Sequence, residues 1–287
     1  MLYVLLGLLI GVLSGFFGVG GGFILTPILL LMGYEPVTAI TISLLYTIGT
    51  SFSGVFAHLR MKNIIWKPAL LVAVSGVAAT QFANPFVMFL KNRGYDELLI
   101  PVFYIVLLGY FAYKMLLQRK GREDELEVFE PSSKLLGYGV IGFIGGFLST
   151  TLGVGGGFII VPLLIAFSGF HPKKAVGTSL VSVLFIVAAG FLTYYIQRPI
   201  DLSLGFILII GGLLGAQLGA RATLIYKQKE IKLLLGVLYT FTMLSMIFKL
   251  FEFNMIGMGI LAGFLTVLYI MMLTRAVFRR KQGTSDT

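Results

Sequence analysis

Residues 18–24 read Gly-Val-Gly-Gly-Gly-Phe-Ile, and the same seven residues return at 153–159. A proline follows the last glycine of each copy at the same distance, as Pro27 and Pro162. Each glycine in a helix interior costs about 1 kcal/mol relative to alanine, so three in a row form a poor helix. The sequence therefore predicts a helix break at both places.

The two copies belong to a longer internal repeat. Matches continue around the motif at an offset of 135 residues, which becomes 136 after an insertion near Ser168. The paired positions are Gly33 with Gly169, Pro36 with Pro172, Ala39 with Ala175, Ser43 with Ser179, Gly54 with Gly190, Gly76 with Gly212 and Gln81 with Gln217. A constant register over such a distance indicates that the chain arose by duplication.

Composition places the chain in a membrane. Of its 287 residues, 57% are hydrophobic and 12% are charged, whereas soluble domains carry about 25% charged residues. Cysteine is absent and histidine occurs twice, as His58 and His171, so we expect no disulfide, no metal cage and no cofactor. The net charge of +10 is attributed to cytoplasmic loops rather than to nucleic-acid binding.

Uncharged apolar stretches divide the chain into nine segments. Seven of them have about the length that crosses a ~30 Å hydrocarbon layer; they are 37–59, 68–90, 98–118, 175–196, 202–220, 233–248 and 255–274. The other two, 2–33 and 135–168, would each extend about 50 Å as unbroken helices. Because each contains one glycine motif, we predict that both turn back within the membrane.

Basic residues change places between matching loops of the two halves. Loop 60–67 is more basic than its counterpart 197–203, whereas loop 221–232 is more basic than its counterpart 91–97. Because Lys and Arg collect on the cytoplasmic side, the two repeats are predicted to face opposite sides of the bilayer. This places the N-terminus outside and the C-terminus in the cytoplasm, in the cell inner (cytoplasmic) membrane.

The predicted fold class is an all-α integral membrane protein with two inverted repeats. It contains about seven full transmembrane helices plus two Gly-broken re-entrant helical hairpins. The predicted divisions are an N-terminal repeat over 1–118, a cytoplasmic linker over 119–133, a C-terminal repeat over 134–254, and an extra helix with a basic cytoplasmic tail over 255–287.

Two glycine turns that enter from opposite sides would meet near the middle of the membrane. Glycine lets backbone N–H groups approach a ligand closely, and the half-helices that follow would direct their positive N-terminal ends at that point. Helix N-termini of this kind bind anions. The candidate substrate-binding residues are Gly20, Gly21, Gly22, Ser43, Gln81, Gly155, Gly156, Gly157, Thr178, Ser179 and Gln217.

Each candidate also has a structural interpretation. The motif glycines could serve close helix packing, as we expect for Gly7, Gly11, Gly15, Gly142 and Gly146. Hydroxyls in membrane helices often bond to the carbonyl one turn back, and the two glutamines could bond between helices. The candidates for a gate or proton relay are His58, Asn84 and Arg221, although His58 also suits the interface and Arg221 a cytoplasmic anchor.

None of the 12 acidic residues falls in the middle of an apolar segment. Proton and Na⁺ pathways often use intramembrane carboxylates, so a cation substrate is disfavoured. Coupling through protonation of the substrate, or through exchange, then becomes the expected route. The segments also show no paired carboxylates, Ser–His–Asp pattern or metal-ligand cluster, so we do not expect an enzyme.

The doubled element GVGGGFIxxPxL at 18–29 and 153–164, with Ala175-Val-Gly-Thr-Ser-Leu180, resembles the TauE/SafE sulfite exporter family of TSUP-type permeases. The resemblance implies a secondary transporter for sulfite, an organosulfonate or another sulfur oxyanion. The alternative is an anion channel or a permease for another small carboxylate or oxyanion. The first copy has Thr41-Ile42-Ser43 where the second has Gly177-Thr178-Ser179, so the two half-sites are expected to differ.

Overall fold

The structure is a computed structural model that describes residues 1–117 and 135–283. The predicted linker over 119–133 lies outside the described residues. The regular elements of the described part are helices: α1 (Leu2–Phe17), α2 (Gly22–Leu31), α3 (Pro36–Arg60), α4 (Trp66–Asn92), α5 (Asp96–Leu117), α6 (Leu135–Leu152), α7 (Gly157–Ser168), α8 (Pro172–Gln197), α9 (Ser203–Ala222), the 3₁₀ turn η1 (Thr223–Ile225), α10 (Gln228–Leu250) and α11 (Asn254–Gly283).

Both long apolar segments are broken at their glycine motifs, as predicted. The first divides into α1 with 16 residues and α2 with 10, and the second into α6 with 18 and α7 with 12. Eight described helices are long and apolar enough to cross a membrane. Seven of these match the predicted spans, and the eighth is α6, which is longer than its counterpart α1.

The central helices α3 and α8 show how the repeats are related. A Cβ at Gly54 would lie 3.0 Å from Leu180, and one at Gly190 would lie 3.4 Å from Leu44. Gly54 is equivalent to Gly190 and Leu44 to Leu180, so one contact occurs twice along an antiparallel pair. A pseudo-two-fold axis therefore crosses the two helices, which is the arrangement of inverted repeats.

The same symmetry pairs the first helix of each repeat with the fourth helix of the other. A Cβ at Gly11 would lie 2.6 Å from the carbonyl oxygen of Gly212, and Gly146 meets the backbone of Gly76 in the same way. Small residues allow this close backbone approach between membrane helices. The expected packing role of Gly7, Gly11, Gly15, Gly142 and Gly146 agrees with these contacts, since a Cβ at each would come closer than 3 Å to a neighbouring residue.

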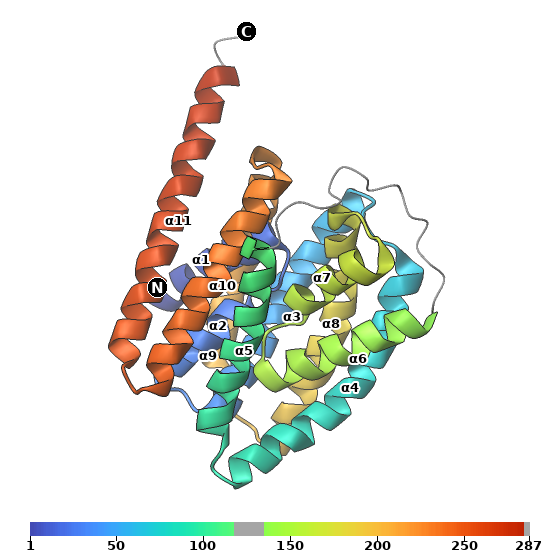
Figure 1. The fold of residues 1–287 in the computed structure, drawn as a ribbon, viewed down its shortest axis with the longest axis vertical. Helices are drawn as coiled ribbons and strands as arrows, with labels where there is room; N and C mark the ends of the chain where they lie inside the picture. Colours follow the sequence, from blue (N-terminus) through green and yellow to red (C-terminus); the bar gives the residue numbers. More distant parts are fainter. Residues whose placement is uncertain (118–134, 284–287) are drawn as a thin grey trace.

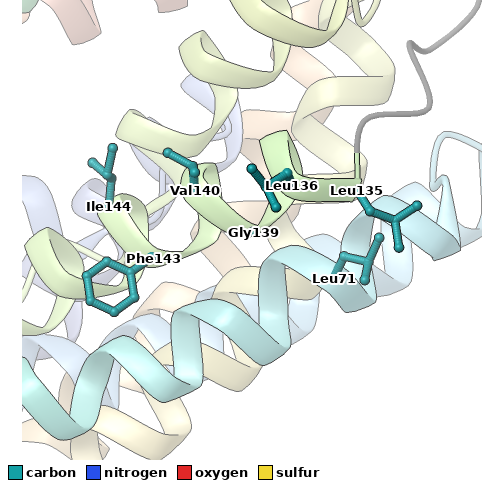
Figure 2. Close-up of a pocket in the computed structure, with 7 residues that line it drawn as sticks. All are labelled: Leu71, Leu135, Leu136, Gly139, Val140, Phe143 and Ile144. Atoms are coloured by element: carbon teal, nitrogen blue, oxygen red, sulfur yellow. The ribbon is translucent and has the colours of Figure 1, made fainter.

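The two pairs differ at one position, and a groove results. In the α1–α9 pair, Gly211 lies against the backbone of Val4. In the α4–α6 pair, its equivalent Ser75 places its hydroxyl against Gly142, and a Cβ built at Gly139 would meet nothing within 4 Å. A groove of about 540 Å³ opens there between α4 and α6 (Figure 2). Its lining is apolar: Leu71, Leu135, Leu136, Gly139, Val140, Phe143 and Ile144.

Helix α11 has no counterpart in the repeat. It packs beside α10 along one side of the molecule and extends beyond the other helices (Figure 1). The hydroxyl of Tyr269 on this helix donates to the carbonyl of Leu9 in α1.

At the centre of the fold, every residue of the half-helix α2 is buried. Such a short helix is tolerated at membrane depth when protein surrounds it.

Candidate anion site at the crossing of the two glycine turns

The two glycine turns touch each other through their backbones. A Cβ at Gly20 would lie 3.6 Å from the carbonyl oxygen of Gly155, and one at Gly157 would lie 3.0 Å from that of Val19. A Cβ at Gly22 would overlap the carbonyl oxygen of Gly153. Side chains at Gly22 and at its equivalent Gly157 would push the turns apart, which explains why glycine stands at this position in both copies.

The backbone of the turns also requires glycine. Gly20 and its equivalent Gly155 both have φ of +80°, in the region that other residues rarely adopt. The next glycines differ between the copies, because Gly21 has φ of −74° whereas Gly156 has φ of +64°. The half-sites are thus unequal at the backbone, although the residue types are identical.

Each turn is followed at once by a half-helix, so two helix N-termini lie at the crossing. The first backbone N–H groups of a helix have no acceptor within it. Among the hydrogen bonds of the described residues, none uses the N–H of Gly22 or Phe23 at the start of α2. The same holds for Gly156 and Phe158 at the start of α7. These donors and the positive ends of two helix dipoles attract negative charge.

Helix α3 brings a hydroxyl to the crossing that the sequence analysis did not single out. A Cβ built at Gly155 would lie 3.3 Å from the Oγ1 atom of Thr47, and a Cβ built at Gly20 would lie 3.3 Å from the methyl group of Thr47. The Thr47 hydroxyl donates to the carbonyl of Ser43 at 2.7 Å. It can therefore still accept, or exchange that bond for one to a ligand.

Further hydroxyls near the crossing are buried and have no hydrogen-bond partner among the described residues. Ser149, in the last turn of α6, lies 3.3 Å from a Cβ built at Gly156, and its Oγ atom is unpartnered. Ser43 and Ser51 lie one turn on either side of Thr47, and both are also unpartnered. Buried polar groups normally have partners, so these groups point to a ligand or water at the crossing.

Aromatic rings close another side of the crossing. Phe23 and its equivalent Phe158, each in the first turn of its half-helix, stack with ring centroids 6.2 Å apart. Tyr239 of α10 packs edge-on against Phe23 at 5.8 Å, and Phe111 of α5 packs against Phe158 at 5.7 Å. This cluster excludes water from that side and strengthens electrostatic interactions nearby.

Four of the predicted substrate-binding residues have other hydrogen bonds or are exposed. Thr178 accepts a hydrogen bond at 3.1 Å from the N–H of Ile65, in the loop between α3 and α4. Ser179 donates to the carbonyl of Val176, the structural interpretation given above. Gln81 and Gln217 are exposed on the outer surface, whereas the turns are buried. A role of these four residues in substrate binding stays a prediction.

The three gate or relay candidates occupy different environments. Asn84 of α4 is fully buried and neither atom of its amide group has a partner, so it remains a candidate for polar contact with a ligand. His58 is partly buried with an unpartnered Nδ1 atom. Arg221 is exposed at the end of α9, which agrees with the anchor interpretation.

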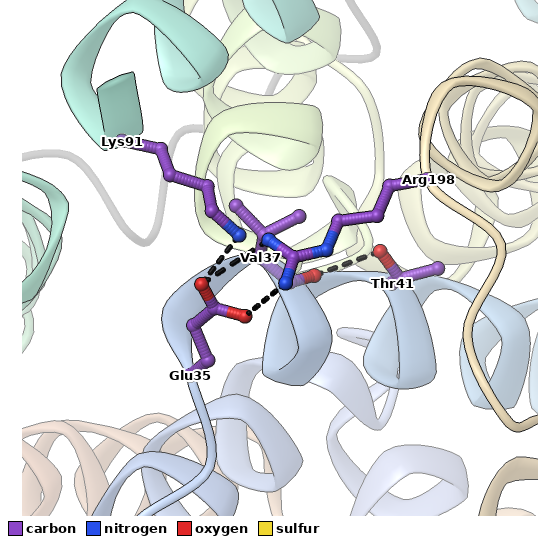
Figure 3. Close-up of polar contacts among 5 residues, drawn as sticks. All are labelled: Glu35, Val37, Thr41, Lys91 and Arg198. Atoms are coloured by element: carbon purple, nitrogen blue, oxygen red, sulfur yellow. Dashed lines mark hydrogen bonds and ion pairs between the residues drawn. The ribbon is translucent and has the colours of Figure 1, made fainter.

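A charged bridge lies at one face of the molecule, outside the glycine site. The carboxylate of Glu35, just before α3, pairs with Lys91 at the end of α4 and with Arg198 at the end of α8 (Figure 3). The Arg198 guanidinium lies 3.1 Å from Glu35. The bridge joins the two repeats.

Inverted repeats that place broken helices against each other at a buried polar crossing define a membrane transporter. The profile of the sulfite exporter TauE/SafE family matches residues 3–246. The chain belongs to this family. No solved structure matches it.

Three relatives illustrate how widely the family occurs. A "Probable membrane transporter protein" of Haemophilus influenzae is 30% identical, and the match covers 80% of this chain and 86% of the relative. A probable membrane transporter protein of Methanocaldococcus jannaschii is 27% identical, and the match covers 85% of this chain and 95% of the relative. A probable membrane transporter protein of Escherichia coli is 25% identical, and the match covers 80% of this chain and 84% of the relative. These similarities show a membrane transporter, as the sequence predicted, and not an enzyme.

Proposed function

We propose that the protein is a secondary transporter that moves a small anion across the cytoplasmic membrane by alternating access. The cargo in this proposal is sulfite or a related sulfur oxyanion or organosulfonate. The anion would bind at the crossing of the glycine turns, and the repeats would then rearrange around it. Protonation of the substrate, or exchange for another anion, would supply the coupling.

One observation carries the proposal: two half-helix N-termini meet at a buried crossing with backbone N–H groups that no acceptor occupies. Helix N-termini favour negative charge. The unpartnered hydroxyls of Ser43 and Ser149 add donors that suit the oxygens of an oxyanion. Transporters of the inverted-repeat type place such termini toward the anionic group of a substrate.

The sulfur oxyanion is suggested by the name of the family, which is described as a sulfite exporter. The relatives are described as membrane transporters without a named substrate. Orientation is likewise part of the proposal, with the N-terminus outside and the basic C-terminal end in the cytoplasm. Basic residues at 279–281 support that orientation, because positive charge marks cytoplasmic segments.

The test is uptake of labelled sulfite by proteoliposomes that contain the full-length protein. Replacement Thr47→Val and replacement Ser149→Ala should each weaken apparent affinity by about tenfold or more, since a hydrogen bond to a charged ligand is worth about 1.5–3 kcal/mol. Thr266→Val is the matched control, because Thr266 is exposed on α11 and bonds only to its own helix. Normal uptake by both site variants would overturn the proposed site, and unitary currents in bilayer recordings would favour a channel.

A further inference from the structure

We propose that the site takes its anion with a single negative charge and rejects the dianionic form of the same compound. This inference rests on the proposed function, because it concerns the anion that the crossing of the glycine turns would hold. It follows from the amount of positive charge that the crossing offers and from the chemistry of the side chains around it.

The positive charge at the crossing comes from two helix ends. Helices α2 and α7 contain 10 and 12 residues, and both begin at the crossing. A helix N-terminus acts as roughly half an elementary charge. Two such ends together offer about one positive charge, which balances one negative charge on a ligand and leaves a second uncompensated.

The side chains around the crossing add donors but no full charge. Thr47, Ser43 and Ser149 contribute hydroxyls. Among the side chains that the structure describes as buried, the one charged residue is Asp96. Asp96 begins α5 and is close enough to interact electrostatically with Glu35, so it belongs with the charged bridge rather than with the crossing.

The titratable groups that face the crossing keep one charge state through the neutral range. Tyr46 lies against Gly21, Tyr104 donates to the carbonyl of Leu152 at 2.6 Å, and Tyr239 packs against Phe23. Phenols ionise near pH 10, so these three stay neutral below that range. His58 lies on α3 about 16 Å along the helix from Thr47. A change of transport between pH 6 and pH 8 would therefore reflect the substrate.

A second negative charge would be costly in this environment. The aromatic cluster of Phe23, Phe158, Phe111 and Tyr239 keeps the crossing apolar on one side. An uncompensated charge in such surroundings loses its hydration and gains too little in return. A monoanion with several oxygens suits the available donors better, because hydroxyls and backbone N–H groups can each bond to one oxygen.

The experiment uses the full-length protein in proteoliposomes with the same pH on both sides. Uptake of labelled sulfite is measured at a low, fixed total concentration from pH 6 to pH 8, while sulfite passes from mainly the hydrogen-bearing monoanion to mainly the dianion. The initial rate should fall by about an order of magnitude, because each pH unit beyond a pKa changes the ratio of the two forms tenfold. Competition at pH 7 is the second measurement, with methanesulfonate as a permanent monoanion and sulfate as a dianion.

Methanesulfonate should compete with sulfite, and sulfate at the same concentration should not. A rate that rises with pH, or competition by sulfate equal to that by methanesulfonate, would overturn the charge preference and leave the proposed anion transport intact. Absence of uptake for sulfite and of binding for methanesulfonate would instead overturn the proposed function together with this inference. Protein-free liposomes provide the background rate in each assay.

Discussion

The carboxylate of Glu35 lies 3.1 Å from the guanidinium of Arg198 and pairs at the same time with the ammonium of Lys91 (Figure 3). Glu35 and Lys91 come from the first repeat and Arg198 from the second, so this bridge ties the repeats together at one face. In the repeat, His171 is the equivalent of Glu35, and Lys62 is the equivalent of Arg198. The equivalent positions at the other face therefore carry no carboxylate, and the two faces of the protein differ.

Replacement Glu35→Gln should make the face at Glu35 open more readily. The bridge is partly exposed, so it is worth at most about 1 kcal/mol, which corresponds to a change of about fivefold in the open population. The chain has no cysteine, so a single introduced cysteine reports access without background. In a Thr41→Cys protein, where residue 41 is buried near the bridge (Figure 3), Glu35→Gln should raise the rate of maleimide labelling about fivefold.

A cysteine at the exposed Met61 is the control for this measurement, because it lies at the opposite end of α3. Its labelling rate should not change with Glu35→Gln. Equal labelling of the Thr41→Cys protein with and without the substitution would show that the bridge does not hold this face closed. The melting temperature should change little in either case, since partly exposed ion pairs contribute little to stability.

The inverted relation of the repeats predicts the sides on which equivalent loops lie. Met32→Cys, at the end of α2, should react with an impermeant maleimide added to one side of intact cells or oriented vesicles. His171→Cys, just before α8, should react only after the membrane is permeabilised. Residues 32 and 171 are both exposed, so access should depend on side alone. Reaction of both with reagent outside intact membranes would contradict the inverted arrangement.

Close packing of α4 against α6 predicts the effect of adding a methyl group. Gly146→Ala would place its Cβ against the carbonyl oxygen of Gly76, and overpacking of this kind costs about 1–3 kcal/mol. Gly263→Ala is the matched control on α11, because nothing lies within 4 Å of its Cβ, and alanine gains up to about 1 kcal/mol in a helix. Thermal unfolding in detergent should show a lower melting temperature for Gly146→Ala and not for Gly263→Ala.

Much of this fold could be predicted from the sequence because the deciding signals are local. The glycine runs after residues 17 and 152 break helices through backbone entropy alone, and apolar segment length fixes the seven predicted spans. Inversion of the repeats followed from the loop charges. The contacts of Gly54 with Leu180 and of Gly190 with Leu44 now show the same inversion in the packing.

The site was harder to predict because both faces of a membrane helix are apolar. Hydrophobic periodicity then does not distinguish the buried face from the lipid-exposed one, and this is why Gln81 and Gln217 could not be placed on the outer surface in advance. Thr47 was missed for a different reason. Most of the predicted polar candidates recur in both repeats, as Ser43 does with Ser179 and Gln81 with Gln217, whereas the equivalent of Thr47 is Val183.

The buried tyrosines Tyr104 and Tyr239 provide a test within one protein. Both are fully buried, but the hydroxyl of Tyr104 donates to the carbonyl of Leu152 at 2.6 Å whereas that of Tyr239 has no partner. Tyr104→Phe leaves a buried acceptor unsatisfied, so it should lower the free energy of unfolding by about 1–3 kcal/mol. Tyr239→Phe removes an unpartnered polar group and should leave stability unchanged or raise it.

Thermal unfolding in the same detergent measures both tyrosine variants, with Tyr113→Phe as an exposed control on α5. The order expected for the melting temperatures is Tyr104→Phe below the parent and Tyr239→Phe at or above it. A fall for Tyr239→Phe equal to that for Tyr104→Phe would mean that the Tyr239 hydroxyl is hydrogen-bonded after all. A bound water or anion at the crossing would be such a partner, and added methanesulfonate should then stabilise the parent more than the Tyr239→Phe protein.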